Sequence, residues 1–238
     1  MLTQDEAKKL AGVGVVDAFV HNGMKLGLGS GTTSHFFVRE LSKHIKNGLQ
    51  VRCTTTSKST IAVAHEVGIE ILDLNEIGEL DLTIDGPDEI DNEFRMIKGG
   101  GACLLWEKIV AHASKRMVTI CDESKIVPQL GKFPLPVEVI QFGWKQTQRL
   151  ITRTLAAHGL VDIAITQRHR GTDVVVTDSG NFILDCHCGQ IKTPEQLEID
   201  LNRIPGVVEN GLFTREACAM VIGNFDGTVS IRHRDIKA

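Results

Sequence analysis

The stretch LDLTIDGPDEIDNEFRMIKGGGACLLWEKIVA (residues 80–111) decides the fold and carries most of the candidate chemistry. It opens with an apolar, partly β-branched run over 80–84, which predicts a buried strand. Gly86-Pro87 cannot continue a strand. The acids beside this dipeptide, Asp85 and Asp88, are therefore expected in a turn just past the carboxyl end of the strand.

A second charged signal lies later in the same stretch. Lys98 precedes three glycines at 99–101, and a helical pattern with Glu107 in its first turns follows. Ordering consecutive glycines costs much chain entropy, so they are favoured where backbone approaches a ligand or directs N–H groups at an anion. The stretch thus combines three acids, a lysine and an anion-binding backbone, a set suited to moving protons on a small anionic substrate.

Strands and helices alternate through the first part of the chain. Thr3 with Glu6 forms a capping-box pattern that opens a helix. Apolar runs predict strands over 24–28, 51–55, 69–72, 80–84 and 117–121, with helices between them. This order predicts an α/β fold with a doubly wound, Rossmann-like, mostly parallel sheet, in which ligands bind at the carboxyl ends of strands.

The pattern changes after residue 130. GKFPLPVEVI (131–140) holds two of the six prolines and indicates a domain crossing. A helix over 144–158, a strand over 161–167, a hairpin of 172–177 with 181–187 and a helix from Pro194 predict an α+β domain. The predicted boundaries are 1–131 plus 209–238 for an α/β catalytic domain, whose sheet the last segment rejoins, and 132–208 for the α+β domain.

Composition indicates an ordinary globular protein. The 238 residues are 42% hydrophobic and 24% charged, with a net charge of −4, so no nucleic-acid surface is expected. The N-terminus lacks the order of a signal peptide, and no apolar run reaches about 18 residues, so neither export nor a membrane span is expected. Six scattered cysteines favour reduced thiols in the cytoplasm.

The loop GLGSGTTS (27–34) ends one predicted strand and opens a helix. It lacks the spacing of a Rossmann fingerprint and the lysine of a Walker loop. Its hydroxyls and the N–H groups of a helix N-terminus would suit a monophosphate. A capped βα turn that binds nothing explains the same residues, and the residues alone leave both readings open.

Four motifs, in order and at consistent spacing, resemble ribose-5-phosphate isomerase, type A. They are GLGSGTTS, the DGxDEID pattern from Asp85, the KGGGxxLLxEKIVA pattern from Lys98, and LGKFPLPVEVI (130–140). The resemblance covers nearly the whole chain. It implies a ferredoxin-like second domain and interconversion of ribose 5-phosphate and ribulose 5-phosphate through an enediolate. Two residues depart from the family's usual pattern, Pro87 in place of Ala and Trp106 in place of a residue that is often Arg.

The resemblance also implies a role for each site residue. Glu107 matches the base, and Asp85, Asp88 and Lys98 match the other catalytic groups. Substrate contacts fall on Ser30, Gly31, Thr32, Thr33, Asp85, Gly86, Pro87, Asp88, Lys98, Gly99, Gly100, Gly101 and Lys125, with Lys8 a further candidate for the phosphate. Read without the resemblance, a solvated acidic turn, an exposed helix glutamate and a surface lysine are the ordinary alternatives.

Other activities and sites remain alternatives. A phosphosugar-binding sensor or an amino-sugar phosphate deaminase could use a similar fold, but neither a basic DNA-binding segment nor a histidine in these motifs supports them. Cys186-His187-Cys188 suggests a metal, yet no partner pair at zinc-like spacing appears. No cofactor and no metal are expected, and the partners are the small substrate and further copies of the chain in a homodimer or homotetramer.

Overall fold

The computed structural model describes residues 1–235, which form two compact units. The first comprises Met1–Pro87, Trp106–Ile126 and Arg215–Ala238, of which 236–238 are not described, and the second comprises Asp88–Leu105 and Val127–Thr214. The structure thus groups residues 88–105, which the sequence-based boundaries place in the first domain, with the second unit. Each unit is described below by itself.

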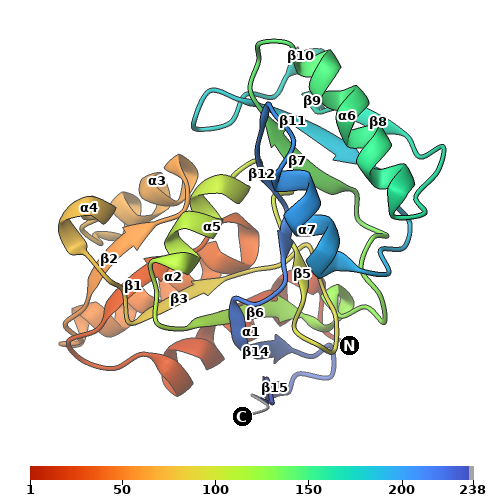
Figure 1. Cartoon of the computed structure of the whole chain (residues 1–238). Helices are drawn as coiled ribbons and strands as arrows, with labels where there is room; N and C mark the ends of the chain where they lie inside the picture. Colours follow the sequence, from red (N-terminus) through yellow and green to blue (C-terminus); the bar gives the residue numbers. More distant parts are fainter. Residues whose placement is uncertain (236–238) are drawn as a thin grey trace. The chain divides into compact units, whose positions relative to one another are not determined.

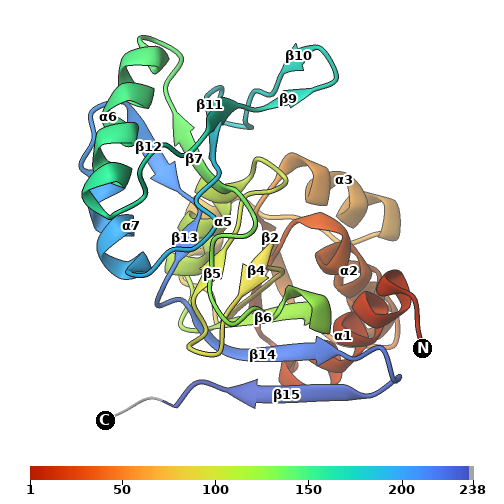
Figure 2. The same ribbon diagram turned by 90° about the vertical axis from the view of Figure 1, so that its right-hand side faces the viewer.

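The first unit is built on one sheet with helices on both faces. Its strands run in the order β15-β14-β6-β3-β1-β2, all parallel except β15, which pairs antiparallel with β14 (Figure 2). The elements are α1 (Gln4–Phe19), β1 (Lys25–Leu28), α2 (Gly31–Lys46), β2 (Arg52–Thr55), α3 (Lys58–Val67), α4 (Leu74–Ile77), β3 (Leu82–Asp85), α5 (Leu104–His112, from Trp106 in this unit), β6 (Met117–Asp122), the 3₁₀ turn η1 (Glu123–Lys125), β14 (Ala217–Gly223) and β15 (Val229–His233).

Alternation along β1 shows which helices cover each face. Leu26 and Leu28 are fully buried in a core cluster with residues of α1 and α2. Gly27 faces the other way, where an added Cβ would lie 2.6 Å from a methyl group of Val110 in α5. Since successive side chains of a strand point to opposite faces, α5 covers the face opposite α1 and α2 (Figure 1).

The second unit consists of smaller antiparallel sheets with two helices. One sheet has the order β12-β7-β11-β8, another β13-β5-β4, and β9 pairs with β10. The elements are β4 (Glu89–Ile90), β5 (Met96–Ile97), β7 (Leu135–Val139), α6 (Trp144–Ala157), β8 (Ile165–Gln167), β9 (His169–Arg170), β10 (Asp173–Val174), β11 (Phe182–Cys186), α7 (Pro194–Asn202), β12 (Val207–Asn210) and β13 (Leu212–Phe213). The predicted α/β class, with a mostly parallel main sheet and smaller antiparallel sheets, is confirmed.

Two local predictions are wrong. Residues 69–72 form no strand, because only Ile71 bridges Cys53 before Asp73 caps the short helix α4. The hairpin of 172–177 with 181–187 keeps its turn, in which Gly180 N–H donates to Thr177 O at 2.9 Å. Its first strand is reduced to Asp173–Val174, which as β10 pair with β9 and not with β11. Only the Val176–Phe182 bridge joins the two predicted strands, because β11 pairs with β7 and β8.

None of the helices within residues 1–235 combines the length and the apolar character that a transmembrane helix needs.

Candidate active site

The site in the first unit begins where β1 and β3 end. In the parallel register Leu28 lies opposite Ile84, so the residues that follow them, Gly29 and Asp85, meet at the same edge of the sheet. Gly29 N–H donates to Ile84 O at 2.9 Å. A Cβ at position 29 would lie 2.2 Å from Asp85 Oδ1, so only glycine allows the carboxylate this position.

Three donors hold the carboxylate of Asp85 in one orientation. Its Oδ1 accepts hydrogen bonds from Ser30 N–H at 2.9 Å, Gly86 N–H at 2.8 Å and Ser34 Oγ–H at 3.2 Å. The side chain is fully buried at the end of β3. Buried polar groups are stabilised by such bonds, and three of them restrict the carboxylate to a single position.

Glu107 reaches the same place from the opposite face of the sheet. It lies on α5 and is buried, and its Oε1 accepts a hydrogen bond of 2.5 Å from Ser30 Oγ. Ser30 therefore contacts both acids, donating its backbone N–H to Asp85 and its hydroxyl to Glu107. Ser30, Asp85 and Glu107 therefore lie together, although Ser30 is 55 positions from Asp85 and 77 positions from Glu107 in the sequence.

The N-terminus of α2 starts immediately after this contact. Ser30 is the N-cap residue, but its hydroxyl is directed at Glu107, to which it donates, and caps no backbone N–H. Gly31 has a φ of +83°, and both Gly31 and Thr32 are exposed, while Thr33 is half-buried. The first turn of α2 holds no acidic residue and its last turn holds basic ones. The positive end of the helix dipole is thus open to an anion.

In the second unit, Asp88 holds the glycine loop. Its Oδ2 accepts the N–H of Gly100 at 2.7 Å, and its own N–H donates to Ile97 O at 2.8 Å across the β4–β5 pair. Gly99 has a φ of +101°, in the left-handed region that favours glycine. A Cβ at Gly100 would lie 2.5 Å from Asp88 Oδ1. The side chain of Asp88 and the loop are therefore fitted to each other.

Lys98 is buried, with 1% of its surface exposed. Its N–H donates to Gly211 O at 2.8 Å, and its Nζ lies 5.6 Å from the centroid of the Phe213 ring, within cation–π range. A Cβ at Gly211 would lie 2.3 Å from Lys98 O, so glycine permits this close backbone pairing. An ammonium group is rarely buried unless its charge has a function or a partner.

Three further predicted substrate contacts, Lys8, Pro87 and Lys125, also belong to the first unit. Lys125 is half-buried at the end of η1, a turn that Asp122 caps through Ser124 N–H at 3.1 Å. Lys8 lies on α1, where its Nζ pairs with Asp5 Oδ1 at 3.3 Å. Pro87 is buried directly after the half-buried Gly86. Their assignment to substrate stays a prediction.

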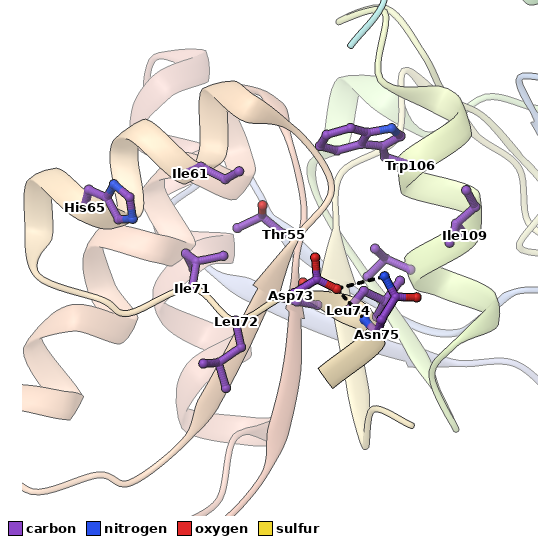
Figure 3. A pocket seen from close by; sticks show the side chains of 12 residues that line it. Thr55, Ile61, His65, Ile71, Leu72, Asp73, Leu74, Asn75, Trp106 and Ile109 are labelled. Carbon is purple, nitrogen blue, oxygen red and sulfur yellow. Dashed lines mark hydrogen bonds between the residues drawn. The ribbon is translucent and has the colours of Figure 1, made fainter. Parts of the chain in front are cut away.

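A cavity of about 500 Å³ lies on another side of α5 (Figure 3). It is lined by Thr54, Thr55, Ile61, His65, Ile71, Leu72, Asp73, Leu74, Asn75, Trp106, Ile109 and Val110. Trp106 and Ile109 face it in Figure 3. Glu107, one position on from Trp106, is not part of its lining, as expected from the rotation of about 100° between successive residues of a helix. The carboxylate of Asp73 is engaged by Asn75, at 2.7 and 2.9 Å. None of the predicted catalytic residues lines this cavity.

The Cys186-His187-Cys188 segment shows the predicted alternation. Both cysteines are buried in the same core cluster and His187 is exposed. Burial raises the pKa of Cys188 to about 12 and that of Cys186 well above its usual value, which favours the protonated thiols. Within residues 1–235, no three His, Cys, Asp or Glu side chains are grouped as metal ligands would be.

Sequence reasoning did not assign Ser34. Its hydroxyl donates to Asp85 Oδ1, and it is fully buried on the first turn of α2. The signal was available, since Ser34 follows Ser30 by four residues and positions four apart lie on one face of a helix.

Comparisons with known proteins agree with one another. The family described as "Ribose 5-phosphate isomerase A (phosphoriboisomerase A)" matches residues 52–227. A "Ribose-5-phosphate isomerase A 2" of Yersinia pseudotuberculosis serotype I (strain IP32953) is 66% identical over 232 residues, covering 97% of this chain and 98% of the relative.

Solved structures give the same result. The ribose 5-phosphate isomerase from Plasmodium falciparum has a TM-score of 0.91 at 31% identity, covering 97% of this chain and 99% of that one. A D-ribose-5-phosphate isomerase in complex with phospho-erythronic acid has a TM-score of 0.90 at 34% identity, covering 98% and 100%.

Proposed function

The chain belongs to the ribose 5-phosphate isomerase A family and interconverts ribose 5-phosphate and ribulose 5-phosphate, and on that premise we propose that Glu107 is its catalytic base. The reaction moves a proton from C2 to C1 of the open sugar through an enediolate. Because the C2 proton is only weakly acidic, a carboxylate must be held at a fixed position beside it.

The hydrogen bond from Ser30 Oγ to Glu107 Oε1 is the observation that carries this proposal. A glutamate on the surface of a helix would sample several rotamers. Glu107 is buried and held through Ser30, whose N–H is in turn bound to Asp85. Orientation of a base by a second group, itself fixed by a third, is the arrangement found where a side chain transfers protons.

Asp85 and Asp88 are proposed to move protons among the sugar oxygens and to assist ring opening. Only two residues separate them, so the chain keeps their Cα atoms within about 10 Å of each other in any conformation. Pro87 between them removes one backbone donor from the turn, and Gly86 N–H already donates to Asp85 Oδ1, so contacts to substrate there fall to the carboxylates.

Lys98 and the backbone N–H groups of Gly99 and Gly101 are proposed to stabilise the enediolate, whereas the N–H group of Gly100, which the sequence also assigned to this role, is bound to Asp88. That intermediate carries negative charge on O1 and O2, and fixed donors stabilise such charge best when they need no reorganisation as it forms. A buried ammonium group and an ordered glycine loop meet this requirement. With these groups as the electrophile, the proposed chemistry needs neither a metal nor a cofactor.

The first turn of α2 is proposed to bind the phosphate. Thr32 and Thr33 offer hydroxyls there, and the N–H groups near Gly31 lie at the positive end of the helix dipole. Ser30, assigned to the phosphate from the sequence, also has the role of orienting Glu107. Lys125 and Lys8 remain proposed contacts to the substrate.

The two alternative functions gain no support. The relatives that cover nearly the whole chain are isomerases by name, and none of those compared above is a sensor or a deaminase. The candidate residues, moreover, form a proton-transfer site rather than a binding surface alone.

Three finer statements belong to the same proposal. The first unit is proposed to be of the doubly wound, Rossmann-like type and the second to be ferredoxin-like. The chain is proposed to act as a homodimer or homotetramer. Reduced cysteines in the core clusters support a cytoplasmic location.

Ser30→Ala tests the proposed arrangement. This variant keeps the N–H bond to Asp85 and removes the hydroxyl bond to Glu107, so kcat for ribose 5-phosphate should fall roughly 10–100-fold, as expected for a bond to a charged group. The matched control is Ser42→Ala, on the same helix, whose hydroxyl donates to Val67 O at 2.8 Å. Turnover by Ser30→Ala equal to that of the control would reject the proposal.

A further inference from the structure

Arg168 links the glycine loop to the sheet of the second unit. It follows β8, where its N–H donates to Ile183 O of β11 at 2.9 Å. Its Nε donates to Asp185 Oδ2 at 2.8 Å, and its Nη2 donates to Asp185 Oδ1. Its Nη1 donates to two consecutive carbonyls, Gly99 O at 2.6 Å and Gly100 O at 3.0 Å. Both charged side chains are mostly buried.

These bonds fix the directions of two backbone donors. In a trans peptide the C=O of one residue and the N–H of the next point in opposite directions. Holding Gly99 O therefore orients Gly100 N–H, and holding Gly100 O orients Gly101 N–H, both away from Arg168. Gly100 N–H does lie on the side opposite Arg168, where it donates to Asp88 Oδ2 at 2.7 Å.

Gly101 is exposed, and little protein lies where its side chain would be. A Cβ at Gly101 would find only Cys103 Sγ, at 3.9 Å, and Gly101 does not have the positive φ that would require glycine. Neither steric crowding nor a positive φ therefore explains why residue 101 is glycine. Close approach of another molecule to the backbone explains the choice.

The loop has one backbone bond of its own, from Ala102 N–H to Gly99 O at 3.0 Å, and Arg168 adds a hold from outside it. Glycine loses more conformational freedom on folding than any other residue, and three stand in a row. Asp185 lies in β11, a strand paired on both sides, by β7 and by β8. The planar fork of Arg168 on this carboxylate is a rigid support that a lysine cannot reproduce.

We propose that Arg168, held by Asp185, is a positioning residue that presets the N–H group of Gly101, next to the Gly100 N–H that Asp88 binds, for the negative charge that develops on the sugar oxygens. This rests on the proposed function, in which the N–H groups of the glycine loop stabilise the enediolate. The role goes beyond the substrate contacts assigned above, since Arg168 contacts the loop and not the sugar.

The test compares Arg168→Lys with Arg170→Lys, an exposed arginine two positions along in β9. Arg168→Lys keeps the charge and loses the fork, so kcat should fall roughly 10–100-fold while KM changes less than about threefold, because the donors act mainly in the transition state. Arg170→Lys should match the parent. If Arg168→Lys also matches the parent, the proposal is overturned.

Two inhibitors separate positioning from general damage. Phospho-erythronic acid carries a carboxylate that resembles the charged enediolate, whereas inorganic phosphate probes only the phosphate site proposed on α2. Arg168→Lys should weaken inhibition by phospho-erythronic acid about tenfold and leave inhibition by phosphate unchanged. Equal weakening of both would overturn the proposal.

Asp185→Asn provides a second variant in case Arg168→Lys does not fold. It retains Arg168 but weakens the charged fork, and it should give the same pattern of kcat loss with a smaller amplitude. A folded Asp185→Asn variant with unchanged kcat would count against the proposal. Failure of the base assignment would appear separately, as activity retained by Glu107→Gln in the presence of an intact Arg168.

Discussion

The two units hold their candidate residues in different ways. The first presents side chains, with Asp85 and Glu107 buried at the carboxyl edge of a parallel sheet and joined through Ser30. The second presents backbone, a glycine loop bound by Asp88 on one side and by Arg168 on the other. A carboxylate at a strand end is placed by its neighbours in the sheet. A glycine loop has no such support and depends on residues far away in the sequence.

This difference predicts different kinetic effects. Changes at the carboxylates should abolish proton transfer and leave binding intact. Changes in the glycine loop should lower transition-state stabilisation through geometry, and changes at Thr32 and Thr33 in the first turn of α2 should mainly weaken phosphate binding.

The largest effect is expected for Glu107→Gln. The amide keeps the shape of the side chain but cannot take the C2 proton, so kcat should fall roughly 10²–10⁴-fold or more. KM should stay close to that of the parent. Steady-state assay with ribose 5-phosphate measures both constants, and a variant within a few-fold of the parent would show that another group is the base.

Gly100→Ala should have the next largest effect. Its Cβ would lie 2.5 Å from Asp88 Oδ1, so the loop or the aspartate must shift and the N–H groups lose their direction. Loss of such a preset donor should lower kcat about 100-fold. The control is Gly143→Ala, at the N-cap of α6, where an added Cβ meets nothing within 4 Å but the φ of +68° strains alanine, so it reports backbone strain away from the glycine loop. A similar small loss in both variants would mean that the loop geometry does not matter for turnover.

Thr33→Val tests the phosphate site with a smaller effect. The substitution removes one hydroxyl at nearly constant volume, so α2 should persist. Losing a hydrogen bond to a charged group should cost roughly 1.5–3 kcal/mol of substrate binding and raise KM accordingly. Inorganic phosphate should become a weaker inhibitor in parallel. Ribose without phosphate should react poorly with both proteins, and an equal loss on ribose and ribose 5-phosphate would make the loop structural.

No effect is expected from prolonged chelation. Lys98 and the loop N–H groups supply the electrophile in the proposed mechanism, and burial raises the pKa values of Cys186 and Cys188, which disfavours the thiolates that bind metals. Activity before and after dialysis against a chelator is the measurement. Loss that one divalent ion restores would overturn the metal-free mechanism.

The sequence predicted the first region better than the second. Asp85, Ser30 and Glu107 stand in motifs whose place at strand ends or helix starts follows from local pattern, and parallel strands bring such ends together. Arg168 lies 68 or 69 residues from the glycines that it binds and belongs to no motif, so no local signal could have found it.

The local errors have a related cause. Residues 69–72 are apolar enough for a strand, but only one of them finds a bridge partner in the sheet. The strand over 172–177 loses its partner to β7 and β8, which already occupy both edges of β11. Propensity and turn signals are local, whereas strand partners are chosen by tertiary structure.

The central claim is that Glu107 carries the proton between C2 and C1, and solvent exchange tests it most directly. The parent protein incubated with ribose 5-phosphate in D₂O should introduce deuterium at C1 of ribulose 5-phosphate and, in the reverse direction, at C2 of ribose 5-phosphate. Glu107→Gln should bind phospho-erythronic acid as the parent does and introduce no deuterium above the rate without protein. Exchange by Glu107→Gln at the parent's rate would contradict the account.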